Sequence, residues 1–426
     1  MFGLDGFYLI FLFILTLIIA IFAGKVVDKV YAKLCLYLFI VGFFIYSGIG
    51  ICYEMVSKIY LIQYFLFGIC FCASFGWSTK VAYKYKAKEN KFIFQKKVTK
   101  TIAILFWILM FIKLVYPVNR IGYLFNINIS IVDILYNKDD ISMLIYVINL
   151  IILLIRPVYY IYLYLECSTK KTVCLLLLEI YVGIAINGYI ARSGLISQII
   201  FIILIIISMN NEKLLEMKKN KDINIKKYLK VLGFLFILII IAMPVLYEYQ
   251  YYRLGVEYKG SAEAIDKIEQ LLSIEFSFPK LYRYCNEYHS IEKFFEYMVY
   301  IITLVIPKKI FGITSTILVN NEISMFISGV SYGSTGFTIY LPGLLGEGII
   351  LLGNNMSFLF GIVLGGIIGL IFSFVEKYKQ MTIWVLYLSI NVMLMCRGGS
   401  QGTVSLFING SLLIFITSFF DRLKIK

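Results

Sequence analysis

Eleven apolar runs, each long enough to cross a lipid bilayer as a helix, follow one another along this chain of 426 residues. A membrane-spanning helix needs about 20 predominantly apolar residues, and the runs lie at 7–23, 34–52, 60–76, 101–117, 142–165, 172–188, 194–209, 231–247, 356–375, 382–396 and 404–420. Hydrophobic residues make up 61% of the chain and its mean hydropathy is +0.87, which excludes a water-soluble globule of this length. The sequence predicts an all-α, polytopic membrane protein with eleven transmembrane helices.

The lysine residues predict how these helices are oriented. The links after the first, third, fifth and seventh apolar runs carry lysines, at 25–33, 80–100, 170–171 and 213–230. Because positively charged loops stay on the cytoplasmic side, these links are predicted to be cytoplasmic and the amino terminus to lie outside. Most of the net charge of +15 belongs to such loops, so the charge gives no reason to infer nucleic-acid binding.

The chain is predicted to form one integral domain made of three parts. Residues 1–247 form an eight-helix membrane bundle, 248–355 a long extracytoplasmic segment, and 356–426 three closing transmembrane helices. The middle part departs furthest from the spanning pattern, because acidic, aromatic and polar residues are mixed along it. We therefore expect the functional site there.

Three short helical patterns lie within this long segment. Apolar residues at helical spacing in 261–272 predict an amphipathic helix, and the apolar residues 294–306 are too few to span and predict a re-entrant or interfacial helix. The run 337–353 is interrupted at Pro342-Gly343 and again at Gly346-Glu347-Gly348. A broken helix is tolerated at membrane depth only where it is buried in protein or lines a wet cavity.

Arginine is distributed differently from lysine. Five of the seven arginines fall on the predicted outer side, namely Arg120, Arg192, Arg253, Arg283 and Arg397. The planar guanidinium group binds phosphate or carboxylate oxygens in a bidentate manner, so this distribution indicates an anionic substrate on that side. The alternative is that each arginine reaches lipid headgroups.

Two pairs among these arginines have distinct surroundings. Arg192 and Arg397 each precede a helix that enters the membrane, and helix amino termini attract anions, so together they predict a pyrophosphate site. Arg253 and Arg283 lie among tyrosines, which suits recognition of a saccharide with a nearby anion. An interfacial belt of tyrosines would have the same composition.

The remaining candidates are acidic groups, one histidine and one further arginine. Glu347 and His289 are the candidates for a general base on the outer side, although His289 is more simply explained as a solvated loop residue. Arg156 and Glu179 fall within predicted helices, where charges are costly alone, so we predict a structural ion pair rather than a catalytic one. Metal-ligand spacings and the common soluble catalytic motifs do not occur in the sequence, so no metal or cofactor is predicted.

Four short segments resemble the Wzy-type polymerases of bacterial O-antigen and capsule repeat units. They are Ala191-Arg192-Ser193-Gly194, Val305-Ile306-Pro307-Lys308-Lys309, Ser334-Thr335-Gly336 and Gly346-Glu347-Gly348. The resemblance implies a GT-C-like membrane glycosyltransferase that needs no metal, in the bacterial cytoplasmic membrane with its active site on the extracytoplasmic side. The family transfers a growing glycan from undecaprenyl pyrophosphate, with inversion, to a newly flipped lipid-linked repeat unit. The products are O-antigen, capsular polysaccharide or exopolysaccharide.

The resemblance also implies roles for particular residues and partners. Arg192, with Arg253, Arg283 and Arg397, would hold the pyrophosphate, and a flippase and a chain-length regulator would be protein partners. One departure from the family is that the long outer segment has no sharply spaced arginine motif. The residues that catalyse the transfer are therefore left open between Glu347 and His289.

Three other functions fit parts of the sequence. An O-antigen ligase-like transferase would use the same donor with another acceptor. A lipid-linked oligosaccharide flippase or other transporter would line its path with Arg156 and Glu179, although the sequence shows no duplicated half. A transferase of single sugars would carry acidic residues in its first outer loop, where this chain has only Glu54.

Overall fold

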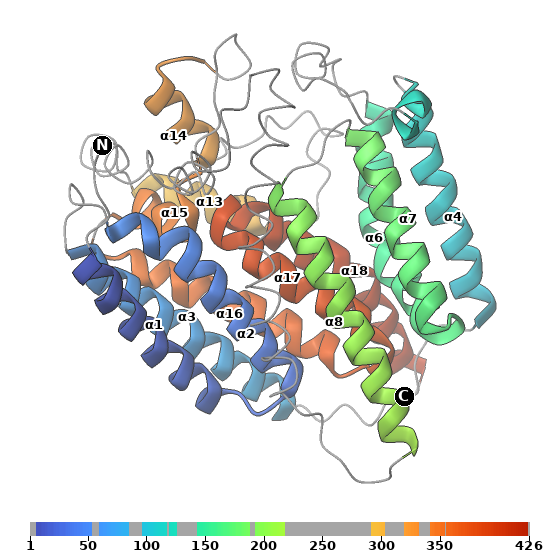
Figure 1. Cartoon of the computed structure of the whole chain (residues 1–426), viewed down its shortest axis with the longest axis horizontal. Helices are drawn as coiled ribbons and strands as arrows, with labels where there is room; N and C mark the ends of the chain where they lie inside the picture. The colour runs from blue at the N-terminus through green and yellow to red at the C-terminus, as the bar shows by residue number, and fades with distance from the viewer. Residues whose placement is uncertain are drawn as a thin grey trace. The chain divides into compact units, whose positions relative to one another are not determined.

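The computed structural model describes residues 6–52, 59–84, 96–116, 119–125, 143–187, 192–217, 291–302, 319–331, 341–353 and 355–424. Every regular element in these ranges is a helix (Figure 1). The described residues belong to two compact units. The first unit lies within Met1–Lys88, Glu269–Lys377 and Leu388–Ile408, and the second within Glu89–Ile268, Tyr378–Tyr387 and Asn409–Lys426.

Seven helices in the described ranges are long and apolar enough to cross a membrane. They are α1 (Gly6–Val26), α2 (Val30–Phe43) with its continuation to Cys52, α3 (Ile59–Lys84), α4 (Lys96–Val115), α6 (Met143–Glu166), α16 (Ser357–Glu376), and η5 (Lys379–Met381) with α17 (Thr382–Gly398). The fold is therefore all-helical in these ranges and has the composition of a multi-pass membrane protein. This agrees with the predicted fold class, although not with the predicted number of spans.

Four of the eleven predicted spans are not among these seven helices. Three form helices, namely α7 (Thr169–Asn187), α8 (Arg192–Met217) and α18 (Ser400–Lys424). Charged residues at the start and within α7 reduce its apolar length, and the apolar stretches described in α8 and α18 are shorter, at Ile196–Asn210 and Ser400–Ile416. The predicted span 231–247 and the predicted amphipathic helix 261–272 lie outside the described residues. The division into parts 1–247, 248–355 and 356–426 stays a prediction.

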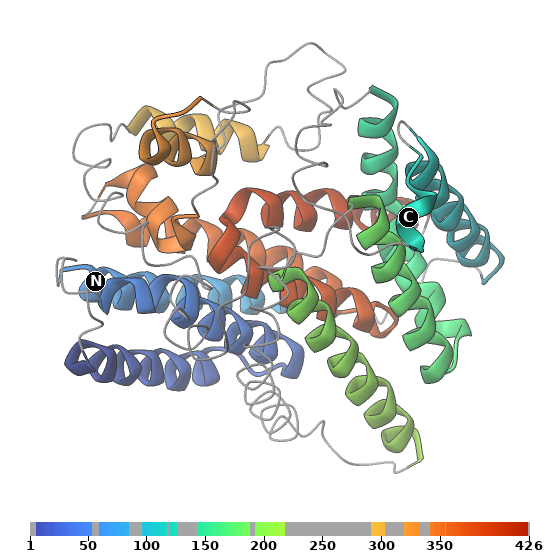
Figure 2. The ribbon, with the colours of Figure 1, turned by 45° about the horizontal axis from the view of Figure 1, so that its top comes forward.

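In the first unit, α3 and α16 pack closely because a row of glycines lies on one side of α16, and Figure 2 shows the ribbons of α1 and α2 of the same unit side by side. A Cβ atom added at Gly361, Gly365 or Gly369 would lie 2.9, 2.4 or 2.7 Å from the backbone oxygen of Phe67, Phe71 or Phe75, respectively. Residues four apart share a helix face, and small residues on such a face let two helix backbones approach. The Ser74 hydroxyl donates a hydrogen bond to the carbonyl oxygen of Ile362 at 2.8 Å across the same contact.

Replacing Gly365 with alanine is expected to destabilise the first unit by about 1–3 kcal/mol, the usual cost of overpacking. The new methyl group would meet backbone oxygen and the Ser74 hydroxyl at 2.4 Å, so the helices would have to separate. Gly366→Ala is the matched control, because its nearest neighbour would be Ser78 Oγ at 3.8 Å. The apparent melting temperature in detergent should fall for Gly365→Ala alone, and equal values for the two variants would contradict this packing.

A short helix, α15 (Gly343–Leu352), is buried against an irregular part of the second spanning segment. After α2 the chain forms a π-helix, η1 (Phe44–Gly48), and a 3₁₀ turn, η2 (Ile49–Cys52). The Leu345 N–H donates to the Ser47 hydroxyl at 3.5 Å, and Gly343, at φ +70°, lies against Tyr46 and Ser47. Residues 343–351 are all buried, so this short helix is enclosed by protein as the broken-helix prediction requires.

One of the two predicted interruptions of this segment is wrong. Pro342-Gly343 does mark a break, because α15 begins there, but Gly346-Glu347-Gly348 lies inside the continuous helix. Glycine costs a helix about 1 kcal/mol. Burial of the leucine and isoleucine side chains of α15 offsets that cost, and Gly348 allows close contact with Phe67 and Phe360.

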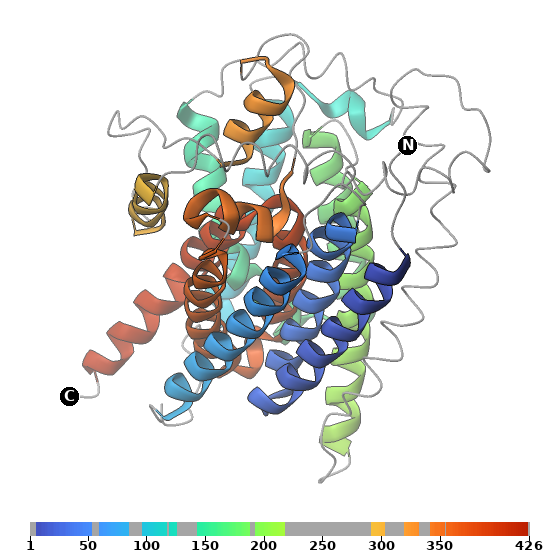
Figure 3. The same cartoon turned by 90° about the vertical axis from the view of Figure 1, so that its left-hand side faces the viewer.

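Two further helices of the first unit are α13 (Ile291–Ile302) and α14 (Val319–Ser328). In α13 the exposed apolar side chains Ile291, Phe295 and Val299 lie along one face, whereas Tyr297 and Ile301 are buried. Figure 3 shows α13 nearly end-on, while α1, α2 and α3 run obliquely across the view. The helix overlaps the run 294–306 that was predicted as a re-entrant or interfacial helix but begins three residues earlier, and its position in a membrane stays a prediction.

Candidate functional site

A buried hydrogen-bonded group lies in the first unit where α18 begins. Glu347 Oε2 accepts a hydrogen bond from the backbone N–H of Ser400 at 2.7 Å, and the hydroxyl groups of Tyr297 and Ser400 share another hydrogen bond. Glu347 is 1% exposed, Tyr297 2% and Ser400 0%. Helices α13, α15 and α18 each contribute one member, so the group joins three elements that are distant in the sequence.

The electrostatic state of Glu347 follows from its burial. Loss of water raises the pKa of this carboxyl group from 4.5 to about 7, although its hydrogen bonds with Ser400 act in the opposite direction. Burial also raises the pKa of Tyr297, and the adjacent Glu347 raises it further. Glu347 therefore changes its charge near neutral pH, whereas Tyr297 stays protonated.

Arg397 lies just before this group, in the last turn of α17, and a tight turn that neighbouring side chains hold in place follows it. The turn contains Gly399 at φ +84°, a conformation that favours glycine. Asn320 Nδ2 donates to the Gly398 carbonyl oxygen at 2.6 Å, and a Cβ atom on Gly399 would lie 3.4 Å from Glu347 Oε2. The same carboxylate and amide therefore hold the backbone between the partly exposed Arg397 and the start of α18.

This geometry changes the interpretation of the α18 amino terminus. From the sequence, the N–H groups of that terminus are predicted to bind a phosphate. In the structure the Ser400 N–H is already bonded to Glu347, which is the usual role of a carboxylate at a helix start. An anion beside α18 would therefore depend on the Arg397 guanidinium rather than on the Ser400 N–H.

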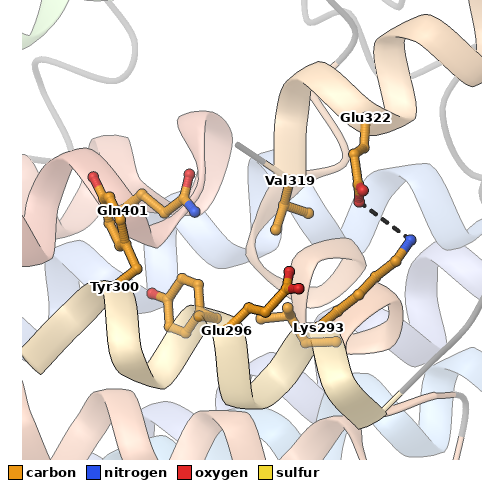
Figure 4. Close-up of a pocket in the computed structure, with 8 residues that line it drawn as sticks. Lys293, Glu296, Tyr300, Val319, Glu322 and Gln401 are labelled. Atoms are coloured by element: carbon orange, nitrogen blue, oxygen red, sulfur yellow. Dashed lines mark ion pairs between the residues drawn. The ribbon is translucent and has the colours of Figure 1, made fainter. Parts of the chain in front are cut away.

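A small pocket opens next to the buried group (Figure 4). Its lining comes from α13, α14, α15 and the first turn of α18, and it consists of Lys293, Glu296, Tyr297, Tyr300, Val319, Glu322, Leu351 and Gln401. Lys293 Nζ and Glu322 Oε2 form an ion pair at 3.2 Å at one end. The pocket thus combines carboxylates, tyrosine rings and an amide at one place.

The other arginines predicted to bind substrate have separate positions. In the second unit, Arg120 donates a hydrogen bond to the Ile186 carbonyl oxygen, in the last turn of α7, which is a typical contact of a cation with a helix carboxyl terminus. Arg192 is the first residue of α8, and its side chain is outside the described part of the chain. Arg253, Arg283 and His289 also lie outside the described residues. A pyrophosphate site shared by Arg192 and Arg397, which belong to different units, stays a prediction.

The predicted contact between Arg156 and Glu179 is present in the second unit. Arg156 Nε lies 3.3 Å from Glu179 Oε1, and Arg156 Nη1 donates to the Tyr387 hydroxyl at 3.0 Å. Tyr160 donates to the same Glu179 oxygen at 3.3 Å. The guanidinium carbon also lies 5.9 Å from the centre of the Phe106 ring. These contacts join α4, α6, α7 and α17, so the pair has a structural explanation.

Breaking this ion pair from one side is expected to be worse than removing it altogether. Arg156→Leu or Glu179→Leu leaves a buried charge without its partner, at a cost of about 3–5 kcal/mol. The double variant leaves no such charge and should recover much of the loss. Thermal unfolding of the four proteins in detergent measures this difference. A double variant as unstable as the sum of both single variants would show that the two groups act separately.

Five members of the site, namely Glu296, Tyr297, Asn320, Ser400 and Gln401, were not predicted from the sequence. Glu296 carried a signal, because it is a charged residue within a segment that is otherwise apolar. The other four are ordinary polar residues, and only the packing of their helices brings them together. Among the described residues no group of three His, Cys, Asp or Glu side chains is placed to hold a metal ion.

No protein family, curated protein or solved structure matches this chain.

Proposed function

We propose that this chain is a membrane glycosyltransferase that polymerises undecaprenyl-pyrophosphate-linked oligosaccharide repeat units into O-antigen, capsular polysaccharide or exopolysaccharide. The observation that carries the proposal is that Arg397 lies three residues before Ser400, next to the turn that the Glu347 carboxyl group and Asn320 hold at the start of α18. A preorganised cation for the departing pyrophosphate is a part that such a transfer needs. A GT-C-like architecture and an extracytoplasmic active site belong to the same proposal.

The proposed reaction is a single displacement at the anomeric carbon of the growing glycan. The bond between this carbon and the pyrophosphate oxygen breaks, and its electron pair leaves with undecaprenyl pyrophosphate. A hydroxyl oxygen of the acceptor repeat unit forms the new glycosidic bond, and its proton passes to a basic side chain of the protein and then to water. Negative charge increases on the leaving pyrophosphate, so a preorganised guanidinium group stabilises the transition state more than the ground state.

The structure describes one of the two predicted general bases. Glu347 is almost fully buried and bonded to Ser400, so we assign it to positioning the turn that carries Arg397. His289 lies outside the described residues and remains a candidate for direct proton transfer. Arg192, Arg253 and Arg283 complete the proposed pyrophosphate contacts.

Cells of the source organism that lack this chain provide the test. We expect them to lose long glycan chains, to keep glycans of a single repeat unit, and to recover the full ladder when the wild-type chain is restored. Gel analysis of surface glycans measures all three results. Loss of every glycan would favour a flippase, and an unchanged ladder would overturn the proposed function.

A further inference from the structure

The turn formed by Gly398 and Gly399, between α17 and α18, is contacted by a side chain of α14. Asn320 Nδ2 donates a hydrogen bond to the Gly398 carbonyl oxygen at 2.6 Å, and a Cβ atom added at Gly399 would lie 3.2 Å from the same nitrogen. Gly398 is the last residue of α17, and the last carbonyl groups of a helix have no partner within that helix. Asn320 therefore supplies such a partner one residue after Arg397.

Helix α14 is anchored to the first unit on both sides of Asn320. Val319 and Ile323 lie four residues apart, on one face of the helix, and they are 5% and 0% exposed. Glu322 Oε2 forms an ion pair with Lys293 Nζ of α13 at 3.2 Å. Apolar burial and an ion pair therefore hold the helix that carries the Asn320 amide.

Asn320 and Glu347 bind opposite ends of the same turn. Asn320 donates to the Gly398 carbonyl oxygen, whereas Glu347 Oε2 accepts from the Ser400 N–H at 2.7 Å. Glycine has more conformational freedom than other residues, so a turn with two consecutive glycines needs such contacts to keep one conformation. A misplacement of about 1 Å in an active site can slow a reaction about a hundredfold. The contact that fixes the backbone next to Arg397 is therefore expected to affect the transfer.

We propose that Asn320 is a positioning residue of the transfer, whose amide fixes the turn formed by Gly398 and Gly399 and thereby holds Arg397 for the departing pyrophosphate. This inference rests on the proposed function, because the pyrophosphate is the ligand that Arg397 would hold. Asn320 itself does not touch the substrate and acts on the reaction only through Arg397. Loss of an interaction made only in the transition state lowers kcat and has little effect on KM, so the same is expected when Asn320 is changed.

The first test compares two neighbouring asparagines of α14. Asn320→Asp keeps the shape of the side chain but replaces the donor with an oxygen that repels the Gly398 carbonyl group. We expect kcat for chain growth by purified protein supplied with lipid-linked repeat units to fall by at least about tenfold at an unchanged KM, within the loss that a misplacement of about 1 Å causes. Asn320→Leu removes the donor without adding a charge and should give the same loss.

Asn321→Asp is the matched control, because adjacent residues of a helix do not share a face and the added charge is the same. It should keep the wild-type kcat, and a wild-type kcat for Asn320→Asp as well would overturn the inference. The double variant Asn320→Asp/Arg397→Ala should be no slower than Arg397→Ala, because residues that act as a unit are not additive. Multiplied losses would show that Asn320 acts elsewhere. A slow Arg397→Ala beside a normal Asn320→Asp would leave the polymerase function standing and the Asn320 role alone wrong.

The second test measures the turn itself and does not depend on the reaction. Gly398 is exposed and a Cβ atom added there would meet nothing within 4 Å, so a nitroxide label on Gly398→Cys fits without a clash. The spectrum of the parent chain, labelled in the same way, is subtracted because that chain has eight cysteines of its own. We expect Asn320→Asp to make the label more mobile in electron paramagnetic resonance spectra and Asn321→Asp to leave it unchanged. Equal mobility in Asn320→Asp and in the labelled protein with Asn320 intact would overturn the inference, even in a protein that does not polymerise.

Discussion

Cells that carry Arg397→Ala are expected to lose long glycan chains, while the amount of protein and the single-repeat glycan stay the same. Loss of one preorganised contact to a developing negative charge typically slows a reaction by about 10²–10³-fold. A long chain needs many successive transfers, so a reduction of this size removes long chains almost completely. Arg397→Lys should recover little, because the ammonium group cannot form the two parallel hydrogen bonds of a guanidinium group.

Arg422→Ala is the matched control for this experiment. Arg397 lies just before the first residue of α18, whereas Arg422 lies near the carboxyl end of α18, on the predicted cytoplasmic side. Removal of the Arg422 side chain should therefore leave the glycan ladder intact. Arg192→Ala is expected to have the same effect as Arg397→Ala if both contact the pyrophosphate. Normal ladders from both alanine variants would show that the pyrophosphate assignment is wrong.

The spanning helices could be predicted because their signal is local. A run such as 356–375 needs no knowledge of its neighbours to be identified as α16 (Ser357–Glu376), since bilayer thickness sets its length. The prediction was less successful where charge enters an apolar run, as in α7. It was wrong at Gly346-Glu347-Gly348, because the low helix propensity of glycine was outweighed by burial in the surrounding helices.

The site could be predicted only in part, because its geometry is not local. The cost of a carboxylate in an apolar segment indicated Glu347, and the structure places it in a buried polar group. Its partner Ser400 is 53 residues away, and Tyr297 and Ser400 are 103 residues apart, so sequence spacing could not associate them. The Arg156–Glu179 contact was predictable because two opposite charges in neighbouring spans have few other partners.

The Glu347→Gln variant is expected to be less sensitive to pH in its stability than the wild-type protein. Burial raises the folded-state pKa of Glu347 from 4.5 to about 7, so between these pH values the folded protein holds a proton that the unfolded chain releases. The resulting stabilisation is fully present below pH 4.5 and is lost as the pH rises through 7. At about 1.4 kcal/mol for each pH unit, the free energy of unfolding of the wild type should fall by about 3 kcal/mol over this range.

Glutamine stays neutral and can still accept the Ser400 N–H through its amide oxygen, so Glu347→Gln should lack that contribution. Thermal unfolding in detergent across a pH series from mildly acidic to mildly alkaline measures the difference, and at the alkaline end Glu347→Gln should melt at a higher temperature than the wild type. Glu296→Gln is the control, because it removes an exposed carboxyl group from a helix of the same unit and should keep the wild-type dependence. Parallel pH curves for Glu347→Gln and wild type would mean that this carboxyl group does not titrate in the buried position. Its part in holding the Arg397 turn would then rest on hydrogen bonding alone, without any contribution from its charge.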